Sequence, residues 1–206
     1  MAFTVSGTNT SFTPAPAGTH VAVCCQLIDL GCQHSEFYDK DTEKIMLGWE
    51  LSNVLEGEPA KPRMVWKQYT RSLGKKANLR GDLENWRGRK FSGEELAAFD
   101  MTKLLGAGCL LSIIHDTKEG TTYANVDAVM ALPQGTPKPL VQGKTVLFDI
   151  DQWDEAVFGG FSENLQAKIR AGRDLREKKR ASSQPKAAMQ YDEHVDPALD
   201  EDGVPF

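Results

Sequence analysis

A chain of 206 residues with 40% hydrophobic and 26% charged residues has the composition of one globular domain with appendages. No apolar stretch is long enough to span a membrane, and the polar N-terminus lacks the pattern of a signal peptide, so we expect a cytoplasmic protein. The formal charge of -5 is unfavourable for binding nucleic acid, but six acidic residues and no Lys or Arg lie in residues 191–206, which leaves the rest nearly neutral.

The N-terminal part of the chain is predicted to form a flexible arm followed by three strands. Residues 1–19 are rich in Thr, Ser, Gly, Pro and Ala, which is typical of such an arm or of a segment at the edge of a sheet. A polar loop between the first two strands carries Phe37 and Tyr38. The strands are expected over residues 20–31, 44–51 and 64–73. Alternation along the second strand predicts inward-facing Ile45, Leu47, Trp49 and Leu51.

A helical segment follows the third strand. Residues 75–86 are predicted to form one helix. Ser92 and Glu95 have the spacing of a capping box, which predicts a second helix that begins there and ends at Leu105, before Gly106.

The C-terminal part begins with a predicted hairpin over residues 109–116 and 121–132, with its turn at Lys118-Glu119-Gly120. A short strand is expected over residues 144–150, and one C-terminal helix, or two, within residues 151–171, beginning near Asp151. From Gly172 the chain is polar, and we predict a disordered tail over residues 172–206.

This order of elements predicts the fold class. Three strands, a helical insert and a two-stranded hairpin are typical of the five-stranded OB-type barrel, a mainly β fold with a helix between strands three and four. No alternation of strands and helices indicates a doubly wound α/β fold. We therefore expect an OB-type barrel over residues 20–171, with the arm over residues 1–19 and the tail over residues 172–206.

Positive charge is concentrated around the third strand. Ten Lys or Arg residues lie between Lys61 and Lys90, and only Asp82 and Glu84 oppose them within that window. Alternation along the strand predicts an outward face made of Arg63, Val65, Lys67, Tyr69 and Arg71, with Trp66 facing the core. Cations interleaved with an aromatic ring suit a surface that contacts phosphates and stacks bases, although a solvated face is the alternative.

The candidate nucleic-acid contacts are therefore cations of this region and exposed tyrosines. For Tyr123 the alternative is a residue at the rim of the barrel. A second basic stretch, from Lys168 to Arg180, either extends the DNA path or solvates a helix end. The full set of candidates is Arg63, Lys67, Tyr69, Arg71, Lys75, Lys76, Arg80, Tyr38 and Tyr123.

The acidic C-terminus predicts a protein-interaction tip. A terminal aromatic ring beside a free carboxylate suits an apolar pocket with a basic rim on another protein. The same tail could cover the positive face when no DNA is bound, and a role in solubility alone is the alternative. The predicted interaction residues are Asp200, Glu201, Asp202, Val204, Pro205 and Phe206.

The sequence lacks the patterns of common enzymes and metal sites. It contains neither a phosphate-binding glycine loop nor a Gly-x-Ser-x-Gly motif. Asp149 and Asp151 could hold Mg²⁺ in a nuclease, but we identify no third carboxylate, and the pair more simply begins a helix. We expect no catalytic residue, metal or cofactor. The cysteines match no common zinc module and are predicted to be buried thiols: Cys24, Cys25, Cys32 and Cys109.

Two segments carry a family resemblance. The block from Leu83 to Phe91 has the pattern Leu-x-x-Trp-Arg-Gly-Arg-x-Phe, followed by Glu94-Glu95-Leu96 and Phe99-Asp100. This block resembles that of tailed-bacteriophage replication proteins related to OB-fold single-stranded DNA-binding proteins. The tip ending in Pro205-Phe206 is similar to the tails of bacterial and phage single-stranded DNA-binding proteins. With the tail, the resemblance covers most of the chain.

The resemblance implies a protein of phage DNA replication or recombination in the host cell cytoplasm, whose tail recruits other replication or recombination proteins. Together with the residue patterns, it predicts a non-catalytic single-stranded DNA-binding protein with little sequence preference. The alternatives are a phage structural or protein-interaction component, whose positive face meets an acidic partner, and a Mg²⁺-dependent nuclease.

Overall fold

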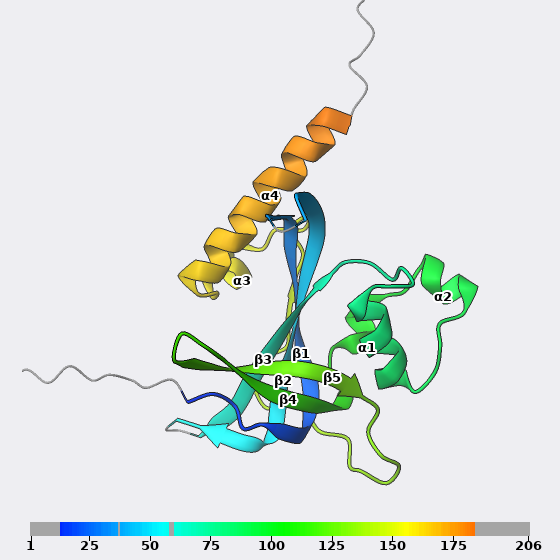
Figure 1. The fold of residues 1–206 in the computed structure, drawn as a ribbon, viewed down its shortest axis with the longest axis vertical. Helices are drawn as coiled ribbons and strands as arrows, with labels where there is room; N and C mark the ends of the chain where they lie inside the picture. The colour runs from blue at the N-terminus through cyan, green and yellow to red at the C-terminus, as the bar shows by residue number, and fades with distance from the viewer. Residues whose placement is uncertain (1–12, 37, 58–59, 184–206) are drawn as a thin grey trace, which may run out of the picture.

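The computed structural model describes residues 13–36, 38–57 and 60–183. They form a mainly β fold with helices, as the sequence predicted (Figure 1). The strands are β1 (Gly18–Ser35), β2 (Lys40–Glu56), β3 (Lys61–Thr70), β4 (Gly108–Lys118), β5 (Thr121–Met130) and β6 (Val146–Phe148). The helices are α1 (Asn78–Arg87), α2 (Gly93–Ala97), the 3₁₀ helix η1 (Met101–Leu104), α3 (Glu155–Gly159) and α4 (Glu163–Ser183).

The strands form one sheet that folds over on itself. Its order is β3-β2-β1-β4-β5 with antiparallel neighbours, and β6 pairs with β1 in parallel. In Figure 1 the β4–β5 hairpin crosses in front of β1–β3. Within the described ranges no strand pairing joins β3 to β5, so the sheet is not closed. A side chain bridges them instead, because Lys67 Nζ donates to the carbonyl of Asp127 at 2.9 Å.

Two local predictions of turns and caps are confirmed, and one helix is shorter than expected. Glu119 and Gly120 both have positive φ, as the two-residue turn of a β-hairpin requires. The Ser92 capping box is present, but α2 ends at Ala97 and does not reach Leu105. The Asp100 carboxylate accepts hydrogen bonds from Thr102, which favours a new turn at η1 over a continuous helix.

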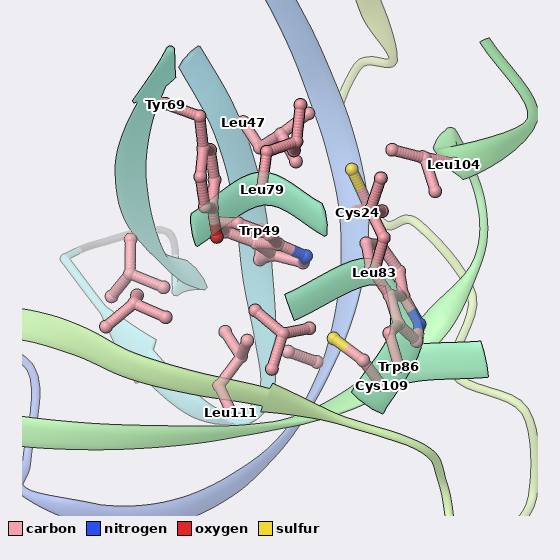
Figure 2. Close-up of a cluster of buried hydrophobic side chains, with 14 of the residues drawn as sticks. Cys24, Leu47, Trp49, Tyr69, Leu79, Leu83, Trp86, Leu104, Cys109 and Leu111 are labelled. Atoms are coloured by element: carbon pink, nitrogen blue, oxygen red, sulfur yellow. The ribbon is translucent and has the colours of Figure 1, made fainter. Parts of the chain in front are cut away.

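The main core lies between the inner face of the sheet and α1. The predicted inward residues of β2, from Ile45 to Leu51, are all buried, which confirms the alternation. Helix α1 contributes Leu79, Leu83 and Trp86 (Figure 2). The Trp86 indole donates to the carbonyl of Gly108 at 2.8 Å, so its polar atom is paired inside the core.

The predicted orientation of β3 is wrong. Val65 and Tyr69 are 4% and 3% exposed and belong to the core, whereas Trp66 is 47% exposed on the outer face. Figure 2 shows the Tyr69 ring inside the cluster. The reason is that Asp82 of α1 accepts hydrogen bonds from Tyr69 Oη at 2.7 Å and from Lys67 Nζ at 2.8 Å. Their polar tips are therefore satisfied while the ring and the aliphatic stem face inward.

A second cluster buries the outer face of β1 and β2. Ile28, Leu30 and Met46 of these strands pack against Phe148 of β6, Ile150 just after it, Phe158 of α3 and Ile169 of α4. The middle of β1 is therefore buried on both faces. Figure 1 shows α4 beside the long β1–β2 hairpin, at the end of the molecule away from α1 and α2.

Helix α4 overturns the predicted start of the disordered tail. Residues 172–183 are helical, and Gly172 is buried against the backbone of β1 at Leu30 and Gly31. The Arg176 guanidinium is also buried and binds the Asp29 carboxylate through two hydrogen bonds of 2.8 Å, and it binds Glu43 as well. The remaining residues of the predicted tail, 184–206, lie outside the described residues.

The predicted arm is packed where it is described. Ala15 is 2% exposed, and its carbonyl is 2.8 Å from Nε2 of His115 on β4. Residues 13–19 therefore pack against the sheet and lead into β1, which agrees with the alternative of an edge segment and not with a flexible arm, and residues 1–12 lie outside the described ranges. Across the described parts of the chain, none of the helices has both the length and the apolar character that a membrane crossing needs.

The close contact at Gly172 gives a test of how α4 is attached. In Gly172→Ala the new Cβ would overlap the Leu30 carbonyl oxygen, so we expect a loss of about 1–3 kcal/mol in the free energy of unfolding. Gly81→Ala in α1 is the matched control. Nothing lies within 4 Å of a Cβ there, and it should gain up to about 1 kcal/mol. Urea unfolding measures both, and equal stability of the two variants would contradict the packing described.

Candidate nucleic-acid interface

Most of the predicted basic region is neutralised by acidic partners. Arg71 lies 3.3 Å from Asp29, and Glu84 binds both Arg80 and Lys90, at 2.9 and 2.8 Å. Arg87 and Arg89 both bind Glu95. Asp29 and Glu95 lie outside the window from Lys61 to Lys90, so the sequence count of charges did not include them. The local excess of positive charge is therefore much smaller in three dimensions than along the chain.

The two glutamates of this region are structural anchors. Hydrogen bonds from Lys90 and Arg80 lower the pKa of Glu84 to about 2. A hydrogen bond from Arg89, together with that of the Ser92 backbone, lowers the pKa of Glu95 to about 2. Both carboxylates are therefore charged at neutral pH, and they connect α1 to the start of α2. The charged residues of the Leu83–Phe91 block thus hold the insert together.

Four of the predicted site residues line one polar pocket of about 500 Å³. This basic pocket is formed by Lys67, Lys75, Lys76, Arg80 and Lys90, with Asp82, Glu84 and Asp127 among the other lining residues. Lys67 and Arg80 are bound to carboxylates. Lys75 and Lys76 are exposed, and in the described part of the chain neither makes an ion pair or a side-chain hydrogen bond. The pocket therefore offers two ammonium groups to an anion.

The other predicted cations lie elsewhere. Arg63 donates to the carbonyl of Thr13, at the start of the described chain. Arg71 lines a different cleft, beside Asp29. The face that was expected to align Lys67, Tyr69 and Arg71 toward solvent therefore does not exist in this fold.

The predicted tyrosines do not converge on one surface. Tyr69 is buried, and burial followed by the Asp82 charge raises the pKa of its phenol, so it cannot stack on a base. Tyr38 is 76% exposed and follows the end of β1, whereas Tyr123 is 48% exposed and pairs with Asp116, beyond the start of β1. The two exposed rings therefore lie past opposite ends of β1, and Tyr123 has a carboxylate beside it.

Trp66, which we expected to face the core, lies exposed on the outer face of β3. The Trp66 ring covers Gly48 of β2 so closely that a Cβ at Gly48 would lie 2.8 Å from Cδ1 of the indole. Its Nε1 donates to Oε1 of Gln26 at 2.9 Å. One side of the indole is therefore held against the sheet, and the ring remains 47% exposed. Gly48 opposite Trp66 was the available signal, because a glycine in a strand often accommodates a large neighbour.

Two lysines bind the residues that follow Trp66 on the same face of β3. Lys168 of α4 donates to Gln68 at 2.7 Å, and Lys44 of β2 donates to Thr70 at 2.9 Å. Burial and then the charge of Lys44 lower the pKa of Lys168, which indicates that the two ammonium groups repel each other. Among the described residues neither has a carboxylate partner at ion-pair distance. We call the surface of Lys44, Trp66, Gln68, Thr70 and Lys168 the tryptophan face.

The tryptophan face can recognise two chemical groups at once. An aromatic ring with an exposed surface stacks on a planar base, and ammonium groups without counter-charges bind phosphate. From the sequence, Lys168 could be recognised only as part of a second basic stretch. Its place on this face depends on the packing of α4 against β1, and its bond to Gln68 joins residues 100 positions apart in the sequence.

The candidate nuclease pair is occupied by structural contacts. Asp151 binds Arg180 through both carboxylate oxygens, and Asp149 accepts from the Asp151 backbone. The pair does not begin a helix as predicted, because Asp154 caps α3. Within residues 13–36, 38–57 and 60–183, no cluster of His, Cys, Asp or Glu could hold a metal ion.

The cysteines are buried free thiols, as predicted. Burial is the main cause that raises the pKa of Cys24 and of Cys25 to about 12. Both are therefore protonated at neutral pH, and a protonated thiol is neither a nucleophile nor a metal ligand.

Comparison with known proteins adds no functional information. No family model matches this chain, and no curated protein matches it either. Its function must therefore be argued from the residues themselves.

The Glu84 anchor predicts a pH dependence of stability. Because its pKa is about 2 in the folded protein and 4.5 in its ordinary state, its ion pairs stabilise the fold above pH 4.5 and are lost as the pH falls toward 2. Glu84→Gln should therefore have a lower Tm than the unmodified protein at neutral pH, and the difference should shrink in acid. Glu94→Gln, at an exposed position of the same insert, is the control. A Tm difference for Glu84→Gln that does not change with pH would contradict this role.

Proposed function

We propose that this protein binds single-stranded DNA and catalyses no reaction. The observation that carries the proposal is the tryptophan face, where an exposed indole is followed along the same strand face by two lysines that make no ion pair among the described residues. In this proposal Trp66 stacks on a base, and Lys44 and Lys168 contact phosphates. These residues take the roles that the sequence had assigned to Tyr69, Lys67 and Arg71.

The strand order supports an OB-type barrel, which we also propose. The order β3-β2-β1-β4-β5, with helices between β3 and β4, is the one expected for that fold. The barrel would be completed at β3 and β5 by the Lys67 bridge to Asp127. OB folds bind oligonucleotides on the face of strands two and three, which is where the tryptophan face lies.

The geometry of the tryptophan face favours a single strand over a duplex. A base can lie on the Trp66 indole only when its flat surface is exposed, whereas in a duplex that surface is covered by neighbouring bases. Alternate residues of a strand lie roughly 7 Å apart, so Trp66, Gln68 and Thr70 are evenly spaced along the outer face of β3. Gln68 binds Lys168 and Thr70 binds Lys44, so the two ammonium groups lie on the side of Trp66 toward the end of β3. Stacking accepts every base, so little sequence preference is expected.

The basic pocket is proposed as a second phosphate contact, through Lys75 and Lys76. The family resemblance supports a role in phage DNA replication or recombination in the host cytoplasm. The acidic residues from Asp200 to Phe206 lie outside the described residues, and recruitment of replication or recombination proteins through them is a proposal from the sequence alone.

Substitution of Trp66 is the direct test. Trp66→Ala should weaken binding of a labelled oligothymidylate roughly 5- to 150-fold, because one stacked base contributes about 1–3 kcal/mol. Tyr123→Ala, at an equally exposed ring beside Asp116, should change the affinity less than about twofold. Fluorescence anisotropy over a salt series measures both, and affinity should fall steeply with salt. Circular dichroism confirms that each variant is folded.

Two controls separate the alternatives. A duplex of the same length should bind more weakly than the single strand, and an oligonucleotide incubated with the protein and Mg²⁺ should stay intact. No binding of the oligothymidylate, or equal binding by Trp66→Ala and the unmodified protein, would contradict the proposal. Cleavage would favour the nuclease instead.

A further inference from the structure

A second cleft, separate from the basic pocket, has an apolar floor. It has a volume of about 540 Å³ and lies between the barrel, the η1 segment and the β6–α3 segment. Its apolar residues include Leu27, Ile45, Leu73, Leu79, Phe99 and Leu147. The Leu147 side chain is 48% exposed, although it lies on a strand paired with the centre of β1. An exposed leucine beside other apolar side chains in a cleft is a typical contact for a partner.

The rim of this apolar cleft carries three fixed carboxylates. Asp100 accepts hydrogen bonds from Thr102, Asp149 from the Asp151 backbone, and Asp154 from two backbone N–H groups of α3. In each case Oδ1 is the acceptor. Among the described residues no hydrogen bond to Oδ2 of any of the three occurs, so each presents an oxygen with a fixed direction and no partner. A carboxylate held in this way is ready for a Lys or Arg side chain.

The charge of the cleft decides what kind of ligand fits. Arg71 is the only cation among the described residues that line it, and it lies 3.3 Å from Asp29, which also binds Arg176. None of the three rim carboxylates makes an ion pair among the described residues, although the charge of Lys103 lies close enough to Asp100 to lower its pKa. This charge repels phosphate, so the cleft does not fit a DNA strand, and it repels the acidic C-terminal segment of this chain for the same reason.

We propose that the apolar cleft docks a short segment of a partner protein in which apolar side chains are flanked by Lys or Arg. The apolar side chains would cover Leu147 and the floor. The basic residues would bind the rim on both sides, because Asp100 comes from the insert and Asp149 and Asp154 come from the β6–α3 segment. A ligand that carries cations on both sides of an apolar centre is typically a peptide, because its basic and apolar side chains are spaced along one backbone. The inference does not depend on DNA binding.

The test uses the full chain and two fluorescein-labelled hexapeptides, one with the core Arg-Leu-Leu-Arg and one with Glu-Leu-Leu-Glu. Anisotropy titrations should show binding of the basic peptide and none of the acidic one. Leu147→Ser should weaken binding about fivefold or more, since it removes apolar contact without changing charge. Asp100→Asn combined with Asp154→Asn should do the same, and asparagine retains the capping bonds.

Matched controls lie outside the cleft. Leu140→Ser removes an exposed leucine, and Asp39→Asn combined with Asp116→Asn removes the same number of charges, so both should bind within about twofold of the unmodified protein. Trp66→Ala should also bind the basic peptide normally, which separates this result from the DNA experiment. Equal binding of the two peptides, no binding of the basic one, or equal losses in cleft and control variants would overturn the proposal.

Discussion

The hydrogen bonds of Asp82 determine how this fold presents its surfaces. Its carboxylate on α1 binds Lys67 and Tyr69 of β3, and Lys67 also reaches the Asp127 carbonyl on β5. One acidic side chain therefore joins the helical insert to β3. Through Lys67 it is also connected to β5, the strand at the other edge of the sheet. Because these bonds satisfy a lysine and a tyrosine on the inner face, the alternate side chains of β3 must face outward.

The tryptophan face also depends on how α4 packs against the sheet. Helix α4 packs on the outer face of β1 at Gly172, and the Arg176–Asp29 ion pair holds it there. This packing brings Lys168 to β3, where its charge is uncompensated. The tryptophan face thus depends on two contacts that are distant in sequence, one on each side of the sheet. One wall of the apolar cleft is formed by β6 and the segment that follows it, from Leu147 to Asp154.

Local sequence signals predicted much of the fold. The alternation of β2, the Glu119-Gly120 turn and the Ser92 capping box each depend on neighbouring residues, and all are present. Alternation along β3 defines two faces, but it does not show which face is buried. Here the choice depends on Asp82 of α1, which pairs with Lys67 and Tyr69 on the inner face. Gly172 was expected to end the ordered domain, because a glycine followed by polar residues is typical of the start of a tail. In the structure this glycine lies inside α4, where its lack of a side chain allows close contact with β1. Likewise, Glu95 and Asp29 neutralise arginines that the local charge count treated as unpaired.

The orientation of β3 can be measured directly by thiol labelling, because all four native cysteines are buried. Cysteine introduced at Gln68, on the outer face with Trp66, should react rapidly with a maleimide in the folded protein. Cysteine introduced at Val65, on the face of Tyr69, should react only after unfolding. Intact mass spectrometry follows both reactions. Rapid labelling at position 65 with protection at position 68 would contradict the account, because it would turn Tyr69 and Lys67 toward solvent and Trp66 into the core.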